Sequence, residues 1–141
     1  MLFVYYPKCS TCQKAKKFLE ENNIEFEERD IKLDHPNYNE LKKWYEKSGY
    51  PLKKFFNTSG LMYKEMNLKE KLPHMSLEEQ LMLLSTDGML VKRPILISKN
   101  QILCGFKESE WNELLKKKWK FKGNGKIYFF FFRMYGIMNS E

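Results

Sequence analysis

Two cysteines follow directly on an apolar run in the stretch Leu2-Phe3-Val4-Tyr5-Tyr6-Pro7-Lys8-Cys9-Ser10-Thr11-Cys12. Beyond it, Ala15, Phe18 and Leu19 recur at the spacing of one helix face. The pattern predicts a strand, a sharp turn and then a helix, with both thiols at the start of the helix. This junction decides which fold the rest of the chain can complete.

A cysteine at the start of a helix differs chemically from an ordinary cysteine. The unpaired N–H groups of the first turn and the positive end of the helix dipole favour the thiolate over the thiol, and Lys8 adds a positive charge beside Cys9. Cys12 lies about one helical turn further on, where it can attack a mixed disulfide formed at Cys9. We therefore predict that Cys9 is a nucleophile and that Cys12 is its resolving thiol.

Two other interpretations of this C-x-x-C pair stay open. A structural zinc ion needs four ligands, and besides this pair the chain offers only Cys104, His35 and His74, far apart in the sequence, so we expect no metal. The two thiols could instead be inert and buried. We expect Cys104 to be a small buried side chain outside any redox site.

The composition predicts one compact domain. Of the 141 residues, 43% are hydrophobic and 16% aromatic, which is enough for a packed core. Residues 1–6 do not have the pattern of a signal peptide, and no run approaches the roughly 18 apolar residues of a membrane span. Two of the three cysteines stand in a C-x-x-C pair, which suits a reducing compartment. We expect a cytoplasmic protein with no membrane partner and no organic cofactor.

The net charge of +7 comes almost entirely from the end of the chain. Residues 116–141 hold seven Lys and Arg residues against one Glu, a net charge of +6, which leaves +1 for residues 1–115. A nearly neutral domain has no field that attracts nucleic acid. The Lys and Phe runs of residues 119–141 are compatible with a membrane-surface segment or an aggregation-prone strand. We expect instead a tail that lies outside the domain of residues 1–118.

The segment after the first helix predicts a β-α-β start. Residues 25–31 are expected to form a second strand. Asn37 with Glu40 three residues later is a capping pattern, and Ser48-Gly49 ends the helix that it opens. The apolar stripe of this helix should face the core; it consists of Leu41, Trp44 and Tyr45.

The middle of the chain predicts a helical insert. Residues 51–73 are expected to be irregular, with a turn at residues 57–60 and a short helix at residues 61–66. Ser76 with Glu79 opens a further helix, which Asp87-Gly88 closes. The apolar stripe of this helix should also face the core; it consists of Leu77, Leu81 and Leu84.

Two short strands and a last helix complete the predicted order. Residues 95–97 and 102–104 flank Lys99-Asn100, a pattern typical of a β-hairpin. A helix should begin near Glu108, with Trp111, Leu114 and Leu115 as its apolar face. The order is β-α-β, a helical insert and β-β-α. With C-x-x-C at the first strand–helix junction, it predicts an α/β, thioredoxin-like fold, a small mixed sheet covered by helices.

Arg93 and Pro94 precede the third predicted strand. Proline cannot donate to a strand ladder, and a cis bond here would give a tight, fixed bend. If this bend faces the thiols, Arg93 can stabilise the Cys9 thiolate or bind an anionic substrate through its planar set of donors. Alternatively, Arg93 faces solvent, which is the usual place of an arginine.

Four segments of the chain resemble the arsenate reductase family of the thioredoxin superfamily, which also includes the Spx-type regulators. The resemblance covers about residues 2–115. Its segments are Tyr6-Pro7-Lys8-Cys9-Ser10-Thr11-Cys12-Gln13-Lys14-Ala15, Phe55-Phe56-Asn57-Thr58-Ser59-Gly60, Arg93-Pro94-Ile95-Leu96-Ile97 and Cys104-Gly105-Phe106. The resemblance implies a thioredoxin-like core with a helical insertion, a nucleophile at Cys9, and Arg93 before a cis Pro94.

The chain also departs from the arsenate-reducing members, which use one cysteine in this loop and three arginines around the oxyanion. Only Arg93 has a counterpart here, and arsenate carries charge that several fixed donors must match. The resemblance therefore implies a thiol–disulfide oxidoreductase that reduces a disulfide or an oxyanion. Its expected catalytic residues are Cys9, Cys12 and Arg93, and its expected substrate-binding residues are Lys8, Ser10, Thr11 and Pro94.

The expected partner is an external thiol reductant, because the cycle would leave a Cys9–Cys12 disulfide. Thioredoxin, glutaredoxin or a low-molecular-weight thiol could reduce it. Spx-type members share the C-x-x-C and Arg-Pro pairs and act by binding RNA polymerase under the control of the disulfide. The alternative is therefore a redox-switched transcriptional regulator, in which the disulfide is a signal and not an intermediate.

Overall fold

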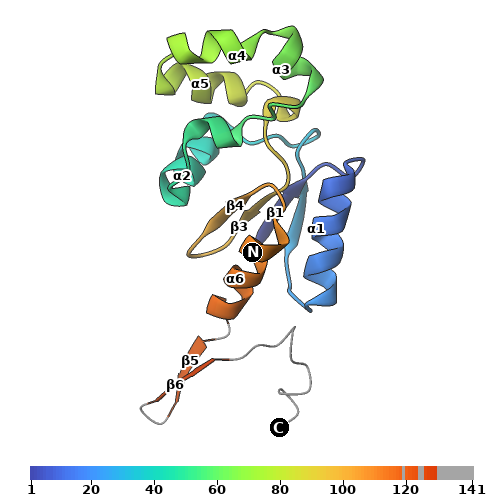
Figure 1. Ribbon diagram of the computed structural model, residues 1–141, viewed down its shortest axis with the longest axis vertical. Coiled ribbons are helices and arrows are strands. Elements are labelled where there is room, and N and C mark those ends of the chain that lie inside the picture. Colours follow the sequence, from blue (N-terminus) through green and yellow to red (C-terminus); the bar gives the residue numbers. More distant parts are fainter. Residues whose placement is uncertain (119, 124–125, 130–141) are drawn as a thin grey trace.

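Four short strands form a mixed sheet. They are β1 (Leu2–Tyr5), β2 (Glu27–Asp30), β3 (Ile95–Ile97) and β4 (Ile102–Cys104), of which β1, β3 and β4 are labelled in Figure 1. The order in the sheet is β2-β1-β3-β4; β1 runs parallel to β2 and antiparallel to β3, and β3 pairs antiparallel with β4. The strand before the two cysteines is therefore central to the sheet.

The structure, a computed structural model, describes residues 1–118, 120–123 and 126–129, with side chains as far as residue 114. Its helices are α1 (Ser10–Glu21), α2 (Tyr38–Ser48), α3 (Leu61–Glu65), α4 (Leu68–Lys71), α5 (Leu77–Leu84) and α6 (Glu108–Lys118). Short 3-10 helices lie at Leu52–Phe55, Leu72–His74 and Gly88–Leu90. Within this part of the chain, no helix has the length and apolar character that crossing a membrane requires.

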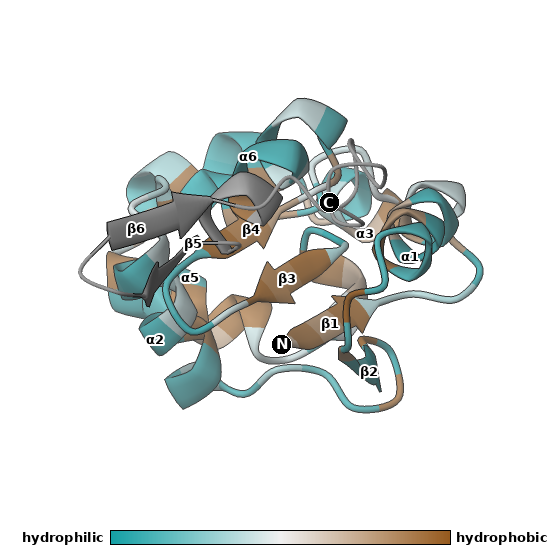
Figure 2. Cartoon of the chain, turned by 90° about the horizontal axis from the view of Figure 1, so that it is seen from below, coloured by the Kyte–Doolittle hydropathy of each residue, from teal (hydrophilic) through white to brown (hydrophobic). Residues whose placement is uncertain are grey.

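Each face of the sheet has its own apolar core, because successive side chains of a strand point to opposite faces. Phe3, Leu96 and Leu103 pack with α1 and α6, whose Phe18 and Trp111 join the same cluster. The neighbouring side chains Val4, Ile95 and Ile102 belong to the second cluster, with apolar residues of α2 and α5. Figure 2 shows the hydrophobic strands β1, β3 and β4 lying among helices that contain many hydrophilic residues.

The predicted order of elements is confirmed, and the capping patterns explain where two of the helices begin. Asn37 and Glu40 form a capping box at α2, and Ser76 and Glu79 form one at α5. Gly49 follows α2 with φ 74°, a left-handed conformation that glycine adopts without a steric penalty. The β3–β4 hairpin also forms as predicted.

Three local predictions were wrong. Helix α5 ends at Leu84, because the Ser85 hydroxyl turns back to the Met82 carbonyl at 2.6 Å, and Asp87 instead caps the following 3-10 helix. Leu77 is 44% exposed and does not join the core. The segment 51–73 is more helical than predicted, since α4 and two 3-10 helices accompany α3.

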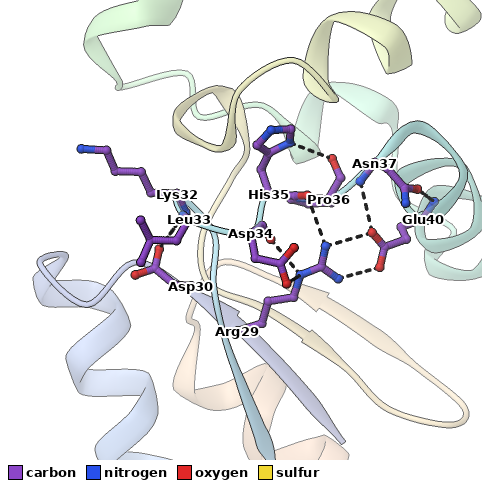
Figure 3. Close-up of polar contacts among 9 residues, drawn as sticks. All are labelled: Arg29, Asp30, Lys32, Leu33, Asp34, His35, Pro36, Asn37 and Glu40. Carbon is purple, nitrogen blue, oxygen red and sulfur yellow. Dashed lines mark hydrogen bonds and ion pairs between the residues drawn. The ribbon is translucent and has the colours of Figure 1, made fainter.

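Arg29 connects strand β2 to helix α2 (Figure 3). Its Nη1 donates to Oε2 of Glu40, and its Nη2 donates to Oε1 of the same carboxylate at 2.9 Å. Its Nε donates to the Asp34 carbonyl at 2.8 Å. The hydrogen bonds from Arg29 lower the pKa of Glu40. Because Glu40 also completes the capping box, one carboxylate both starts α2 and fixes it beside the sheet.

Strands β5 (Lys120–Gly123) and β6 (Lys126–Phe129) pair antiparallel with each other in a separate two-stranded sheet. The prediction for Leu115 concerns a side chain outside the described part of the chain. The predictions for the end of the Phe run and for the rest of the tail likewise concern residues outside the described part of the chain. The boundary at residue 118 therefore stays a prediction.

Candidate functional site

The two cysteines lie where β1 turns into α1. The Cys9 amide donates to the Tyr6 carbonyl at 3.0 Å, which closes the turn, and Cys9 is the residue that precedes the helix. Cys12 lies in the first turn of α1, and its side chain is completely buried. The predicted strand, turn and helix therefore place both sulfurs at one helix N-terminus.

The environments of the two thiols are opposite. Burial alone would raise the pKa of Cys9, but hydrogen bonds from the Cys12 amide and thiol, the Thr11 amide and Arg93 together lower it from its ordinary value of 9.0. Burial raises the pKa of Cys12 to about 12. Both are free cysteines; Cys9 is partly exposed and Cys12 is not. Thiolate character is thus concentrated on the sulfur that a substrate can reach.

Arg93 reaches this turn because of the strand register. Val4 of β1 lies opposite Ile95 of antiparallel β3, so the residues after β1 meet those before β3. The Arg93-Pro94 bond is cis, as the resemblance implied. The Arg93 side chain helps to lower the pKa of Cys9 and so favours its thiolate. The Arg93 side chain therefore influences Cys9, another predicted catalytic residue, and the third, Cys12, is buried.

The residues predicted to bind substrate fall into two groups. Lys8, Ser10 and Thr11 are exposed around Cys9. Pro94 is buried, and its carbonyl accepts a hydrogen bond from the Gly105 amide at 2.8 Å. The first three side chains are therefore accessible from solvent, whereas Pro94 is not, and the substrate-binding role of all four stays a prediction.

Two neighbours of Arg93 were not predicted from the sequence. The ring of Tyr6 lies 5.3 Å from Arg93 Cζ, and Met89 Sδ lies 4.0 Å from Arg93 Nη1. Tyr6 belongs to the quoted cysteine motif, whereas nothing in the sequence distinguishes Met89. The segment from Met89 to Arg93 is held by the Asn57 turn, since the Asn57 amide donates to the Leu90 carbonyl at 2.8 Å.

Other features of the structure lie apart from these residues. Cys104 is buried, and burial raises its pKa to about 12. The described residues contain no group of three or more His, Cys, Asp or Glu side chains that could hold a metal ion. A cavity of about 200 Å³ in the helical insert contains none of the predicted site residues; it is lined by Lys53, Tyr63, Lys69, Leu72, Pro73 and Gln80.

Two relatives cover most of the chain. Uncharacterized protein YusI of Bacillus subtilis is 56% identical over 113 residues, which are 80% of this chain and 96% of YusI. Regulatory protein MgsR of the same bacterium is 31% identical over 118 residues, which are 84% of this chain and 92% of MgsR.

Solved structures of similar proteins show the same fold. An ArsC family related protein from Bacteroides fragilis has 57% identity and a TM-score of 0.78, over 80% of this chain and 95% of that chain. A possible arsenate reductase from Streptococcus mutans has 42% identity and a TM-score of 0.72, over 78% and 95%. The predicted α/β, thioredoxin-like fold is thereby confirmed.

A protein-family model matches most of this chain. The model of the ArsC family matches residues 4–114, a range that includes the C-x-x-C turn, the helical insert and the Arg93-Pro94 bend. The cysteine turn and the Arg93-Pro94 bend are also two of the segments that resemble this family in sequence. The chain therefore belongs to the ArsC family, the arsenate reductase family of the thioredoxin superfamily.

Proposed function

We propose that this protein is a thiol–disulfide oxidoreductase in which Cys9 and Cys12 reduce a disulfide or an oxyanion. The observation that carries the proposal is the inequality of two thiols within one helical turn. Cys9 is accessible and its pKa is lowered, whereas burial raises the pKa of Cys12 to about 12. The thiolate is the attacking form of a cysteine, so the accessible thiol with the lowered pKa suits the first attack and the buried thiol suits the later, resolving step.

The first step with a disulfide substrate is attack by the Cys9 thiolate on one of its sulfurs. A bond forms between Cys9 and that sulfur, the substrate S–S bond breaks, and the second sulfur leaves as a thiolate that solvent protonates. Arg93 favours the Cys9 thiolate before attack. Lys8, Ser10 and Thr11 surround the reacting sulfur and bind the substrate, and Pro94 supports Arg93.

The second step transfers the mixed disulfide to Cys12. Burial is the main cause of the raised pKa of Cys12, and the negative charge of Cys9 is a further cause. That charge disappears when Cys9 forms the mixed disulfide, so Cys12 loses its proton to solvent more readily. Its thiolate attacks Cys9 and releases the rest of the substrate as a thiolate. Two electrons have then passed to the substrate, and a Cys9–Cys12 disulfide remains.

An external thiol system completes the cycle by reducing this disulfide. Thioredoxin, glutaredoxin or a low-molecular-weight thiol supplies the two electrons, and we place the protein in the cytoplasm, where these reductants are kept reduced. Reduction of an oxyanion would use the same two thiols. With Arg93 as the predicted guanidinium at the site, we expect disulfides to be the better substrates.

The test is the pH dependence of alkylation at each cysteine, followed by mass spectrometry. We expect Cys9 to react with a pKa below the free-thiol value of about 8.5, while Cys12 and Cys104 stay unreactive in the folded protein. Mild oxidation should then form a Cys9–Cys12 disulfide in wild type and in Cys104→Ser, but not in Cys9→Ser or Cys12→Ser. An ordinary pKa at Cys9 together with no such disulfide would refute the proposal.

Activity is the second arm of this test. Wild type should reduce hydroxyethyl disulfide when glutathione or thioredoxin is supplied with its reductase, and Cys104→Ser should do so equally well. Cys9→Ser should be inactive, whereas Cys12→Ser should accumulate the mixed disulfide. Arsenate is offered in a parallel assay and should be reduced more slowly than the disulfide.

A second candidate function is a redox-switched regulator that binds RNA polymerase, as the Spx-type regulators do. The 31% identity to regulatory protein MgsR favours it. In this case the Cys9–Cys12 disulfide would alter a binding surface and would not turn over. Capture of RNA polymerase by only one redox form of the immobilised protein, with no disulfide reductase activity, would favour the regulator over the enzyme.

A further inference from the structure

Tyr6 contacts all three residues that carry the proposed chemistry. Its carbonyl accepts from the Cys9 amide at 3.0 Å, and its amide donates to Cys12 Sγ at 3.5 Å. Its ring lies 5.3 Å from the guanidinium carbon of Arg93. The first two contacts use the backbone and would survive most substitutions, so the side chain of Tyr6 acts on Arg93.

Arg93 lies between an aromatic ring and a thioether. No ion pair involves Arg93 within the described part of the chain. Its neighbours are the Tyr6 ring and the Met89 sulfur, 4.0 Å from Nη1. A carboxylate would fix the guanidinium but would also neutralise it. An aromatic face and a thioether fix the guanidinium and leave its positive charge available to a thiolate.

We propose that Tyr6 is a positioning residue, whose ring holds the Arg93 guanidinium beside Cys9 through a cation–π contact. The inference rests on the proposed roles of Cys9 and Arg93. Of the five N–H donors of a guanidinium, Arg93 directs one at Met89, and its side chain also favours the Cys9 thiolate. The remaining donors can bind an anionic group of the substrate, provided that the ring keeps the side chain in place.

The experiment compares substitutions at Tyr6 that separate ring shape, ring electrostatics and the hydroxyl group. The readout is the rate of Cys9 alkylation at a pH below the Cys9 pKa. Tyr6→Phe should react like wild type, because it keeps the aromatic face. Tyr6→Leu should react about two- to tenfold more slowly, the range that a cation–π contact at a partly exposed site can account for.

Pentafluorophenylalanine at position 6 separates electrostatics from packing. It preserves the shape of the ring but reverses the charge distribution of its face, so it should slow alkylation as Tyr6→Leu does. This variant keeps the test decisive if Tyr6→Leu unfolds. Tyr50→Leu is the matched control, since the Tyr50 ring lies 3.9 Å from Lys54 Nζ in a similar contact elsewhere; it should leave Cys9 unchanged.

The dependence on Arg93 completes the test. In an Arg93→Gln background, Tyr6→Leu should have no further effect on Cys9, because no cation remains to be positioned. Additive effects of the two substitutions would overturn the role of Tyr6 while leaving that of Arg93 intact. An unchanged rate in the pentafluorophenylalanine variant would also overturn it. If Cys9 instead has an ordinary pKa in wild type, the proposed function fails, and the inference fails with it.

Discussion

The depth of a sulfur in this fold decides its acidity. Cys9 is at the surface end of the first helical turn, where amides, a thiol and a guanidinium converge on it, and its pKa is lowered. Cys12 points into the core and burial raises its pKa to about 12. The two side chains are chemically identical, so their pKa values differ only because Cys9 lies at the surface at the start of the helix while Cys12 faces the core.

The buried thiols predict a loss of stability at high pH. Burial raises the pKa of Cys12 and of Cys104 from 9.0 to about 12. Between these values the folded state binds more protons than the unfolded state, so the free energy of unfolding falls as pH rises. Each thiol can contribute at most about 1.4 kcal/mol per pH unit to this slope. Urea unfolding of the reduced protein at several pH values within this window measures the slope.

Cys104→Ala provides the comparison for this prediction. Alanine has no proton to lose, so the free energy of unfolding should fall less steeply with pH in this variant than in wild type. The offset between the two proteins at neutral pH reports the lost packing and does not matter. Parallel slopes would show that Cys104 titrates normally in the folded state and would contradict the prediction.

At the scale of elements, local sequence signals predicted where helices begin better than where they end. The capping boxes of α2 and α5 depend on residues three positions apart, so the sequence contains the whole interaction. The end of α5 and the exposure of Leu77 depend on neighbours that the chain brings together only after folding. For the same reason, the C-x-x-C turn was predictable, whereas the contacts of Tyr6 and Met89 with Arg93 were not.

Glu40 connects helix α2 to strand β2, so substituting it should lower the stability of the fold. Glu40→Ala removes both the capping partner of Asn37 and the ion pair with Arg29. In this ion pair the Arg29 side chain is 15% exposed and the Glu40 side chain is 32% exposed. We expect the free energy of unfolding to fall by about 1–3 kcal/mol. Glu40→Gln keeps an acceptor for the Asn37 amide and should cost less. Chemical unfolding of both variants beside Ser76→Ala, which affects a cap alone, measures the difference.

The stabilisation that Glu40 provides should depend on pH in the acid range. The pKa of Glu40 is lowered from 4.5 by hydrogen bonds from Arg29, so its contribution is present above 4.5 and is lost as pH falls through the folded pKa. The gap in stability between wild type and Glu40→Gln should therefore narrow below pH 4.5. A gap that stays constant at acid pH would mean that the ion pair does not stabilise the fold.

At the scale of the whole molecule, we predict that the domain does not need the end of the chain. Among the residues whose side chains the structure describes, residues 1–114 supply the sheet β2-β1-β3-β4 and both apolar cores, and β5 and β6 pair with each other. Truncation after Lys118 should therefore leave the melting temperature and the rate of Cys9 alkylation unchanged. Differential scanning fluorimetry and alkylation of the two chains side by side measure this. A fall of several degrees in the melting temperature would place the tail within the domain.

Strand β2 has a further consequence for the molecule. It is an outer strand of the sheet, and its residues Glu27, Glu28, Arg29 and Asp30 are all charged. The open backbone edge of such a strand is a template on which another chain can add its own strand and begin a fibril. Four charges in succession make that addition costly, because an incoming strand would have to accommodate them. We therefore expect the least apolar strand of the sheet to disfavour edge-to-edge pairing between copies of the folded chain.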